Sequence, residues 1–223
     1  MAIQRRIQIA PSLLAADLAR AGEEVNAVHR AGADILHVDV MDGHFAPNLS
    51  FGPDTVHWLN KACEIPIGTH LMVTDPRRFI EPFAEAGSDE LFFHIEIDDD
   101  HLELARTIRD MGVRAGVTLE MQTPPEAARS LVGEVDALLV MTVRCGYTGQ
   151  SFHPEASQKI PALRQMFGEE VDILVDGGVG VDNVTKLAEM GANVFVAGKS
   201  IFWADDVAAA VSELRAGGEA AFQ

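Results

Sequence analysis

Short apolar runs alternate with amphipathic segments along the whole chain. The apolar runs cover residues 6–14, 34–40, 66–73, 90–96, 114–120, 137–143, 171–176 and 193–198. Most of them are apolar at consecutive positions, which is typical of parallel strands that are covered on both faces. We therefore expect each run to form a buried strand.

The segments between these runs have the apolar spacing of helices. We expect helices over 17–31, after Pro53, from Pro76 to Gly87, over 100–111, after Pro125, and over 155–167, 182–190 and 205–215. The joins AGAD, AGSD and MGAN repeat where a helix ends and the next strand begins, because glycine readily closes a helix. The pattern predicts eight strand–helix units.

Eight such units close most naturally into a (β/α)₈ barrel, the TIM-barrel fold, with its ligand site at the carboxyl ends of the strands. The alternative is an open, doubly wound sheet, but no GxGxxG motif follows the first strand. A single hydrophobic core serves up to about 250 residues. We therefore predict one α/β domain, a single (β/α)₈ barrel, over residues 1–223.

The chain is acidic, with 34 Asp and Glu against 17 Lys and Arg and a net charge of −17. This charge disfavours nucleic acid and anionic membranes as partners, because both would be repelled at long range. The 2 cysteines are too few for a disulfide framework, and no apolar span reaches the roughly 18 residues of a membrane helix. We expect a soluble, cytoplasmic protein.

Metal-ligand residues gather at the predicted strand ends. His37 and Asp39 are two residues apart, so in a strand they share a face. Together with His70 and Asp176 they make an N₂O₂ set suited to a divalent ion. One buried histidine alone is more often a hydrogen-bonded core residue, but four such residues at one barrel end favour a metal. We expect His94 and Glu96 to support this site from outside the ligand set or to be structural.

Glycines follow the sixth, seventh and eighth predicted strands. Their positions are Gly146, Gly149, Gly177, Gly178 and Gly198. Bare backbone amides let a phosphate approach closely, and the loops after strands seven and eight are the usual phosphate site of this barrel. The sequence therefore predicts a phosphorylated small-molecule ligand.

Several motifs resemble those of the ribulose-phosphate 3-epimerase family. They are APSLLAAD (10–17), HVDVMDGHFAPNLSFGP (37–53), HLMV (70–73), the GxxGQ of residues 146–150, VDGGV and GANVFVAG (191–198). They occur in the order and spacing of the family and span the chain. The resemblance implies a (β/α)₈ barrel that interconverts D-ribulose 5-phosphate and D-xylulose 5-phosphate.

The resemblance also implies residue roles. His37, Asp39, His70 and Asp176 match metal ligands, commonly for one zinc ion per subunit, and Asp39 and Asp176 match the acid–base pair. The implied substrate contacts are Ser12, Met41, His70, Met72, Met141, Gly146, Tyr147, Thr148, Gly149, Gly177, Gly178, Gly198 and Lys199. The ligand set also accepts iron(II), manganese or cobalt, and family members commonly form homo-oligomers.

The chemistry of epimerisation fits these residue types. Inverting a carbon beside a ketone removes a proton from one face and returns one to the other, so two carboxylates must flank a planar enediolate. A metal draws charge from the enediolate oxygens. Methionines form an apolar wall that keeps water from the intermediate, although each one alone is more often ordinary core.

The chain departs from the family pattern in the loops. Arg144 and Cys145 stand where the family usually has Asn and Pro, and Thr148 replaces Gly. Leu119, Glu120 and Met121 replace LNP, and AGKS replaces AGSA, which introduces Lys199. These changes lie around the far end of the substrate, so we expect them to bear on substrate identity more than on reaction type.

Two interpretations of the loop residues stay open. Lys199 and Arg144 provide charge-assisted hydrogen bonds to a phosphate, or Arg144 pairs with Glu120 as a structural ion pair. Cys145 is a low-pKa thiol beside Arg144 or, more simply, has no function.

Three functions are compatible with the sequence. The first is a metal-dependent 3-epimerase of D-ribulose 5-phosphate. The second is a paralogous epimerase that acts on a different phosphorylated ketose. The third is a catalytically silent phospho-sugar binding protein, which gives no reason for keeping both aspartates and both histidines.

Overall fold

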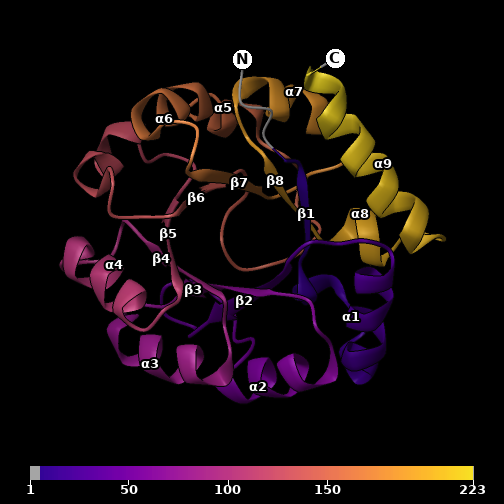
Figure 1. Cartoon of the computed structure of the whole chain (residues 1–223), viewed down its shortest axis with the longest axis horizontal. Helices are drawn as coiled ribbons and strands as arrows, with labels where there is room; N and C mark the ends of the chain where they lie inside the picture. Colours follow the sequence, from indigo (N-terminus) through magenta and orange to yellow (C-terminus); the bar gives the residue numbers. More distant parts are fainter. Residues whose placement is uncertain (1–5, 223) are drawn as a thin grey trace.

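The computed structural model describes residues 6–222, and eight parallel strands form its centre. They are β1 (Gln8–Pro11), β2 (Leu36–Met41), β3 (Ile67–Met72), β4 (Glu90–His94), β5 (Arg114–Leu119), β6 (Ala137–Met141), β7 (Asp172–Asp176) and β8 (Val194–Ala197). Their order is β1-β8-β7-β6-β5-β4-β3-β2, and a parallel bridge between Ser12 and His37 joins the two outer strands. The sheet is therefore a nearly closed barrel with helices around it (Figure 1), which confirms the predicted fold.

Helices follow the strands and cover the outside of the barrel. They are α1 (Ala21–Arg30), α2 (Pro53–Ala62), α3 (Arg77–Ala86), α4 (His101–Asp110), α5 (Pro154–Ser157), α6 (Ile160–Phe167), α7 (Val184–Met190), α8 (Lys199–Phe202) and α9 (Val207–Glu219). Asp100 and Asp206 cap α4 and α9 by accepting hydrogen bonds from backbone amides. Gly87 and Gly191 end α3 and α7 in the left-handed conformation. Among the described residues, no helix is long and apolar enough to cross a membrane.

Some helices differ from the sequence prediction. The helix expected over 155–167 is divided into α5 and α6, because Pro161 near the start of α6 has no amide hydrogen to continue the bonding of the preceding turn. The helix expected after Pro125 is a 3₁₀ helix, Pro125–Leu131. The short helix α8 directly after Gly198 was not predicted.

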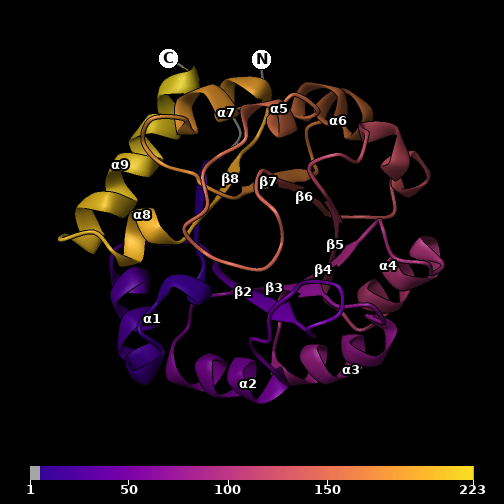
Figure 2. The same cartoon turned by 180° about the vertical axis from the view of Figure 1, so that it is seen from behind.

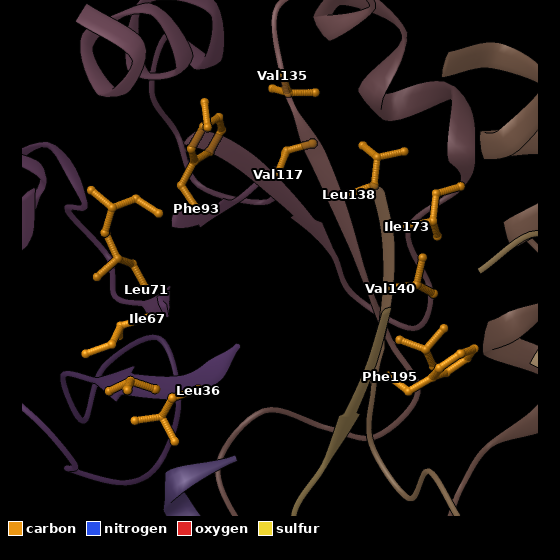
Figure 3. Close-up of a cluster of buried hydrophobic side chains, with 14 of the residues drawn as sticks. Leu36, Ile67, Leu71, Phe93, Val117, Val135, Leu138, Val140, Ile173 and Phe195 are labelled. Atoms are coloured by element: carbon orange, nitrogen blue, oxygen red, sulfur yellow. The ribbon is translucent and has the colours of Figure 1, made fainter. Parts of the chain in front are cut away.

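The main apolar core lies between the strands and the helices. Figure 3 shows part of it, with Leu36, Ile67, Leu71, Phe93, Val117, Val135, Leu138, Val140, Ile173 and Phe195 labelled. Along each strand these residues alternate with residues that point into the barrel. The packing of the helices therefore fixes which side chains face inward.

The barrel interior is filled by a smaller apolar cluster. It includes Ala10, Phe92, Leu139, Leu174 and Val196, all nearly or fully buried. Above it the loop after β6 arcs across the centre of the barrel (Figure 2). The side chains of this cluster therefore form a second apolar core inside the barrel.

Gly116 makes room for the largest of these interior side chains. It pairs with Phe92 across β4 and β5, and a Cβ at Gly116 would lie 2.1 Å from a ring carbon of Phe92. We predict that Gly116→Ala lowers the free energy of unfolding by ~1–3 kcal/mol, because the core is already full. Denaturant unfolding measures this change.

The matched control for this prediction is Gly22→Ala. Gly22 lies in α1 and has nothing within 4 Å of the added Cβ, so alanine is expected to raise stability slightly through helix propensity. Equal stability of Gly116→Ala and the wild-type protein would contradict the packing argument.

Candidate active site

Four side chains of metal-ligand type meet at the carboxyl ends of β2, β3 and β7. His37 and Asp39 lie on the same face of β2, His70 faces them from β3, and Asp176 ends β7. One donor atom from each lies within 4.8 Å of the others. The structure therefore brings together the ligand set that the sequence predicted.

Asp39 is the common neighbour within this cluster. Its Oδ1 lies 3.1 Å from His70 Nδ1 and 3.2 Å from His37 Nε2. Its Oδ2 accepts a hydrogen bond of 2.7 Å from Ser12 Oγ. Since Asp39 is only 4% exposed, these contacts stand in for the water that would otherwise solvate the carboxylate.

His37 provides the test of whether a metal fits. Among the described residues, neither of its ring nitrogens has a hydrogen-bond partner, although both are buried. Its Nε2 lies 3.2 Å from Asp39 Oδ1, but the geometry is not that of a hydrogen bond. The same nitrogen lies 3.9 Å from Asp176 Oδ2. An unpaired buried nitrogen is costly, and a cation between Nε2 and the carboxylates removes that cost. The N₂O₂ donors therefore fit a divalent ion.

The two carboxylates have opposite proton affinities. Burial alone would raise the pKa of Asp39, but the charge of His37 and the hydrogen bond from His70 hold that pKa well below its usual range. Burial and the negative charge of Asp39 raise the pKa of Asp176 to about 7. Burial lowers the pKa of His70 to about 3. His70 is therefore neutral, which a metal-binding imidazole must be.

A hydrogen-bonded chain leads from His70 to the loop after β5. His70 Nε2 lies 2.9 Å from His94 Nε2, and His94 Nδ1 lies 3.0 Å from Glu96 Oε2. Glu96 Oε1 accepts hydrogen bonds from the Glu120 amide and from Thr123 Oγ1. Such outer partners orient a metal-binding histidine. His94 and Glu96 thus lie outside the ligand cluster, in the supporting position that the sequence suggested.

A cavity of about 720 Å³ opens above the cluster. Ser12, Asp39 and Asp176 lie at its base, and Met41, Met72 and Met141 line it nearby. The three methionines are 2–5% exposed, so they present a dry, polarizable surface. All three predicted methionines therefore reach the cavity.

The predicted glycine loops line the other end of the cavity. Gly146, Gly149, Gly177, Gly178 and Gly198 all contribute. Gly177 and Gly178 have positive φ angles of 122° and 67°, and a Cβ on either would come within 2.8 Å of Val143 or Phe152. These two positions therefore require glycine, and their backbones stay bare toward the cavity.

Lys199 and Thr148 also lie at the glycine end. Lys199 begins α8, and its Nζ lies 5.5 Å from the ring centroid of Trp203. Thr148 Oγ1 lies 3.3 Å from the point where a Cβ on Gly198 would be. Both residues line the cavity, so they narrow the glycine end and add a positive charge to it.

The alternative ion pair between Arg144 and Glu120 is absent among the contacts of residues 6–222. Arg144 is exposed and lines the cavity. Burial, together with the carboxylate of Glu120, raises the pKa of the Cys145 thiol, so the low-pKa interpretation is wrong. Cys145 Sγ instead lies 3.8 Å from His94 Nε2.

The location of two departures was also predicted wrongly. Glu120 and Cys145 group with His94, beside the ligand cluster, whereas the sequence analysis placed them at the far end of the substrate. Thr148 and Lys199, in contrast, line the glycine end of the cavity. The reason is that the carboxyl ends of β4, β5 and β6 are neighbours around the barrel.

Sequence reasoning missed the residues that hold the loop after β6. Asn48 Nδ2 donates to the Gly146 carbonyl at 2.8 Å, and Tyr147 Oη donates to the Pro47 carbonyl at 2.7 Å. A third missed contact joins other loops of the cavity: Trp203 Nε1, just after α8, donates to the Ala15 carbonyl at 2.9 Å. Pro47 and Asn48 lie inside the HVDVMDGHFAPNLSFGP motif, which was the available signal.

Comparison with known proteins agrees with this arrangement. The model of the ribulose-phosphate 3 epimerase family matches residues 8–202. A ribulose-phosphate 3-epimerase of Mycobacterium tuberculosis is 47% identical over 210 residues, which are 93% of this chain and 91% of that protein. The cytoplasmic isoform from Oryza sativa subsp. japonica is 43% identical over 219 residues and 96% of both chains.

Solved structures show the same fold at lower identity. A KGPDC from Streptococcus mutans in complex with D-R5P has a TM-score of 0.76 at 16% identity and covers 97% of this chain and 99% of its own. A 3-hexulose-6-phosphate synthase from Salmonella typhimurium has a TM-score of 0.70 at 18% identity, covering 96% and 100%. On the family model and these relatives, as the motifs predicted, the chain belongs to the ribulose-phosphate 3-epimerase family and is an isomerase.

Proposed function

We propose that this protein interconverts D-ribulose 5-phosphate and D-xylulose 5-phosphate by proton transfer between two carboxylates. The observation that carries the proposal is the placement of Asp39 and Asp176 on separate strands, both facing one cavity beside two histidines. Relatives up to 47% identical are named for this epimerisation. The cavity is lined both by the three methionines and by bare glycines, and a sugar phosphate needs both kinds of surface.

The two aspartates divide the proton transfer. One carboxylate takes the proton from C3 on one face of the sugar, and the other returns a proton to the opposite face. Their roles exchange in the reverse reaction. Before an ion binds, the low pKa of Asp39 and the pKa of about 7 for Asp176 give the two carboxylates different proton affinities, and an acid–base pair needs such a difference.

His37, Asp39, His70 and Asp176 would hold one divalent ion, and when bound it supplies electrostatic stabilisation for the negative charge on the substrate oxygens. Ser12 holds Asp39 through its Oδ2, so the carboxylate keeps its orientation as the substrate binds. Met41, Met72 and Met141 exclude water from the reacting carbons. Zinc as the ion, assembly into homo-oligomers and a place in pentose phosphate metabolism stay predictions.

The phosphate of the substrate is assigned to the glycine end of the cavity. Gly146 to Gly149, Gly177, Gly178 and Gly198 present backbone there. The ammonium of Lys199 lies over the ring of Trp203. In this proposal it moves from the ring to the phosphate when the substrate binds, and it forms a charge-assisted hydrogen bond there. His70 and Tyr147 are the remaining predicted substrate contacts. In this proposal His70 acts as a member of the ligand cluster, and Tyr147 acts by holding the loop after β6.

Deuterium exchange in heavy water tests the proposed reaction. With D-ribulose 5-phosphate we expect deuterium to enter at C3, because a proton held by a carboxylate exchanges with solvent before it returns. A panel of other ketose phosphates and the metal content are measured alongside. No exchange with any ketose despite bound metal would favour the silent binding protein, and exchange with a different ketose alone would favour the paralogous epimerase.

Replacing Asp176 tests the two-carboxylate arrangement. Asp176→Asn is expected to reduce kcat by at least about 100-fold, since an amide neither accepts nor returns the proton. Metal content is measured in the same sample, so that loss of the ion is distinguished from loss of the acid–base group. Asp205→Asn, at an exposed position, is the control, and near-normal turnover of Asp176→Asn would refute the assignment.

Replacing Lys199 tests the phosphate end. Lys199→Ser is expected to raise KM for the phosphorylated ketose by roughly 10-fold, which corresponds to the loss of one charge-assisted hydrogen bond of about 1.5 kcal/mol. Lys186→Ser, exposed on α7, should leave KM unchanged. An unchanged KM in Lys199→Ser would mean that the lysine stays on Trp203 throughout the reaction.

A further inference from the structure

A second group of donor side chains lies beside the proposed active site. His94 ends β4, Glu120 directly follows β5, and Cys145 lies in the loop after β6. One donor atom from each lies within 4.8 Å of the others. Imidazole, carboxylate and thiolate are ligands of zinc and of ions like it.

The best-defined distance in this group fits a tetrahedral ion. Cys145 Sγ lies 3.8 Å from His94 Nε2. Bonds of about 2.3 Å to sulfur and about 2.0 Å to nitrogen at a tetrahedral angle imply a separation of roughly 3.6 Å. The sulfur and nitrogen are therefore separated by about the distance between two ligands of one ion. A turn of the His94 ring away from His70 Nε2, which lies 2.9 Å from it, and an adjustment of the Glu120 side chain complete the site.

The surroundings favour a cation at this point. Burial raises the pKa of the Cys145 thiol, and the carboxylates of Glu120, Asp176 and Asp39 raise it further, so several acids lie close enough to the sulfur to attract a cation. The ammonium of Lys159 donates to the carbonyl oxygens of Glu120 at 2.6 Å and of Met121 and Thr123. Lys159 thus fixes the loop that carries Glu120, and its charge offsets part of the negative charge of Glu96 and Glu120.

We infer that His94 Nε2, Glu120 and Cys145 Sγ bind a second divalent ion of borderline softness, such as Zn²⁺, Co²⁺ or Cd²⁺. On binding, the Cys145 thiol releases its proton to solvent and the sulfur bonds to the ion. Cys145 lines the cavity, which gives the ion a path of entry and a fourth position for water. This site is distinct from the proposed His₂Asp₂ centre, which contains no sulfur.

The two centres share one contact. His94 Nε2 is also the partner of His70 Nε2, and this nitrogen cannot both hydrogen-bond to His70 and bind an ion. The second ion therefore withdraws His94 from His70. Ion binding at the second site is therefore expected to remove the hydrogen bond that orients His70, which is a proposed ligand of the first ion.

Cobalt titration of the metal-free full-length protein tests this inference. Co²⁺ bound to a thiolate has an intense near-ultraviolet charge-transfer absorption, which Co²⁺ in a centre of nitrogen and oxygen ligands lacks. We expect this absorption in the wild-type protein and its complete loss in Cys145→Ser. Glu120→Gln is expected to weaken the binding of the absorbing ion by at least about 10-fold.

Two variants serve as controls. Cys63→Ser removes the other thiol, which donates to the Leu59 carbonyl, and should keep the absorption. His37→Gln combined with Asp176→Asn damages the His₂Asp₂ centre and should also keep it, whether or not the protein is an epimerase.

Two results would overturn the inference. The first is cobalt binding to the wild-type protein without thiolate absorption. The second is loss of that absorption in the His37→Gln, Asp176→Asn variant while circular dichroism shows a folded protein, because Cys145 would then be a ligand of the first ion.

Discussion

The burial of the Asp39 carboxylate is the constraint on which this structure depends. A charge that is 4% exposed is tolerable only where the barrel brings partners to it. Ser12 donates to one oxygen, while His37 and His70 face the other. Ser12 and His37 also form the bridge that joins β1 to β2. Closing the barrel and supporting the carboxylate are therefore done by the same residues.

Buried acids at the two ends of the barrel have different kinds of partner. At the amino end, Arg114 pairs with Glu90 and with Asp172, the latter at 2.6 Å. At the carboxyl end, no lysine or arginine of residues 6–222 pairs with Asp39 or Asp176. The acids at the carboxyl end are therefore left for a bound cation to neutralise, and the cavity opens there.

The sequence predicted what depends on periodicity and strand ends. Because side chains alternate along a strand, His37 and Asp39 had to share a face, and the apolar runs had to form the strands that carry them. It did not predict the grouping of His94 with Cys145, which are 51 residues apart. That contact depends on the stagger between neighbouring strands and on the path of a loop, and neither follows from hydrophobic pattern.

The residues that depart from the family pattern therefore lie in two different parts of the site. Thr148 and Lys199 line the glycine end of the cavity, where they reduce its space and add a positive charge. Glu120 and Cys145 contact the chain of hydrogen bonds that begins at His70. A change in that chain acts on the orientation of the His70 imidazole, so the setting of these two residues is the ligand cluster.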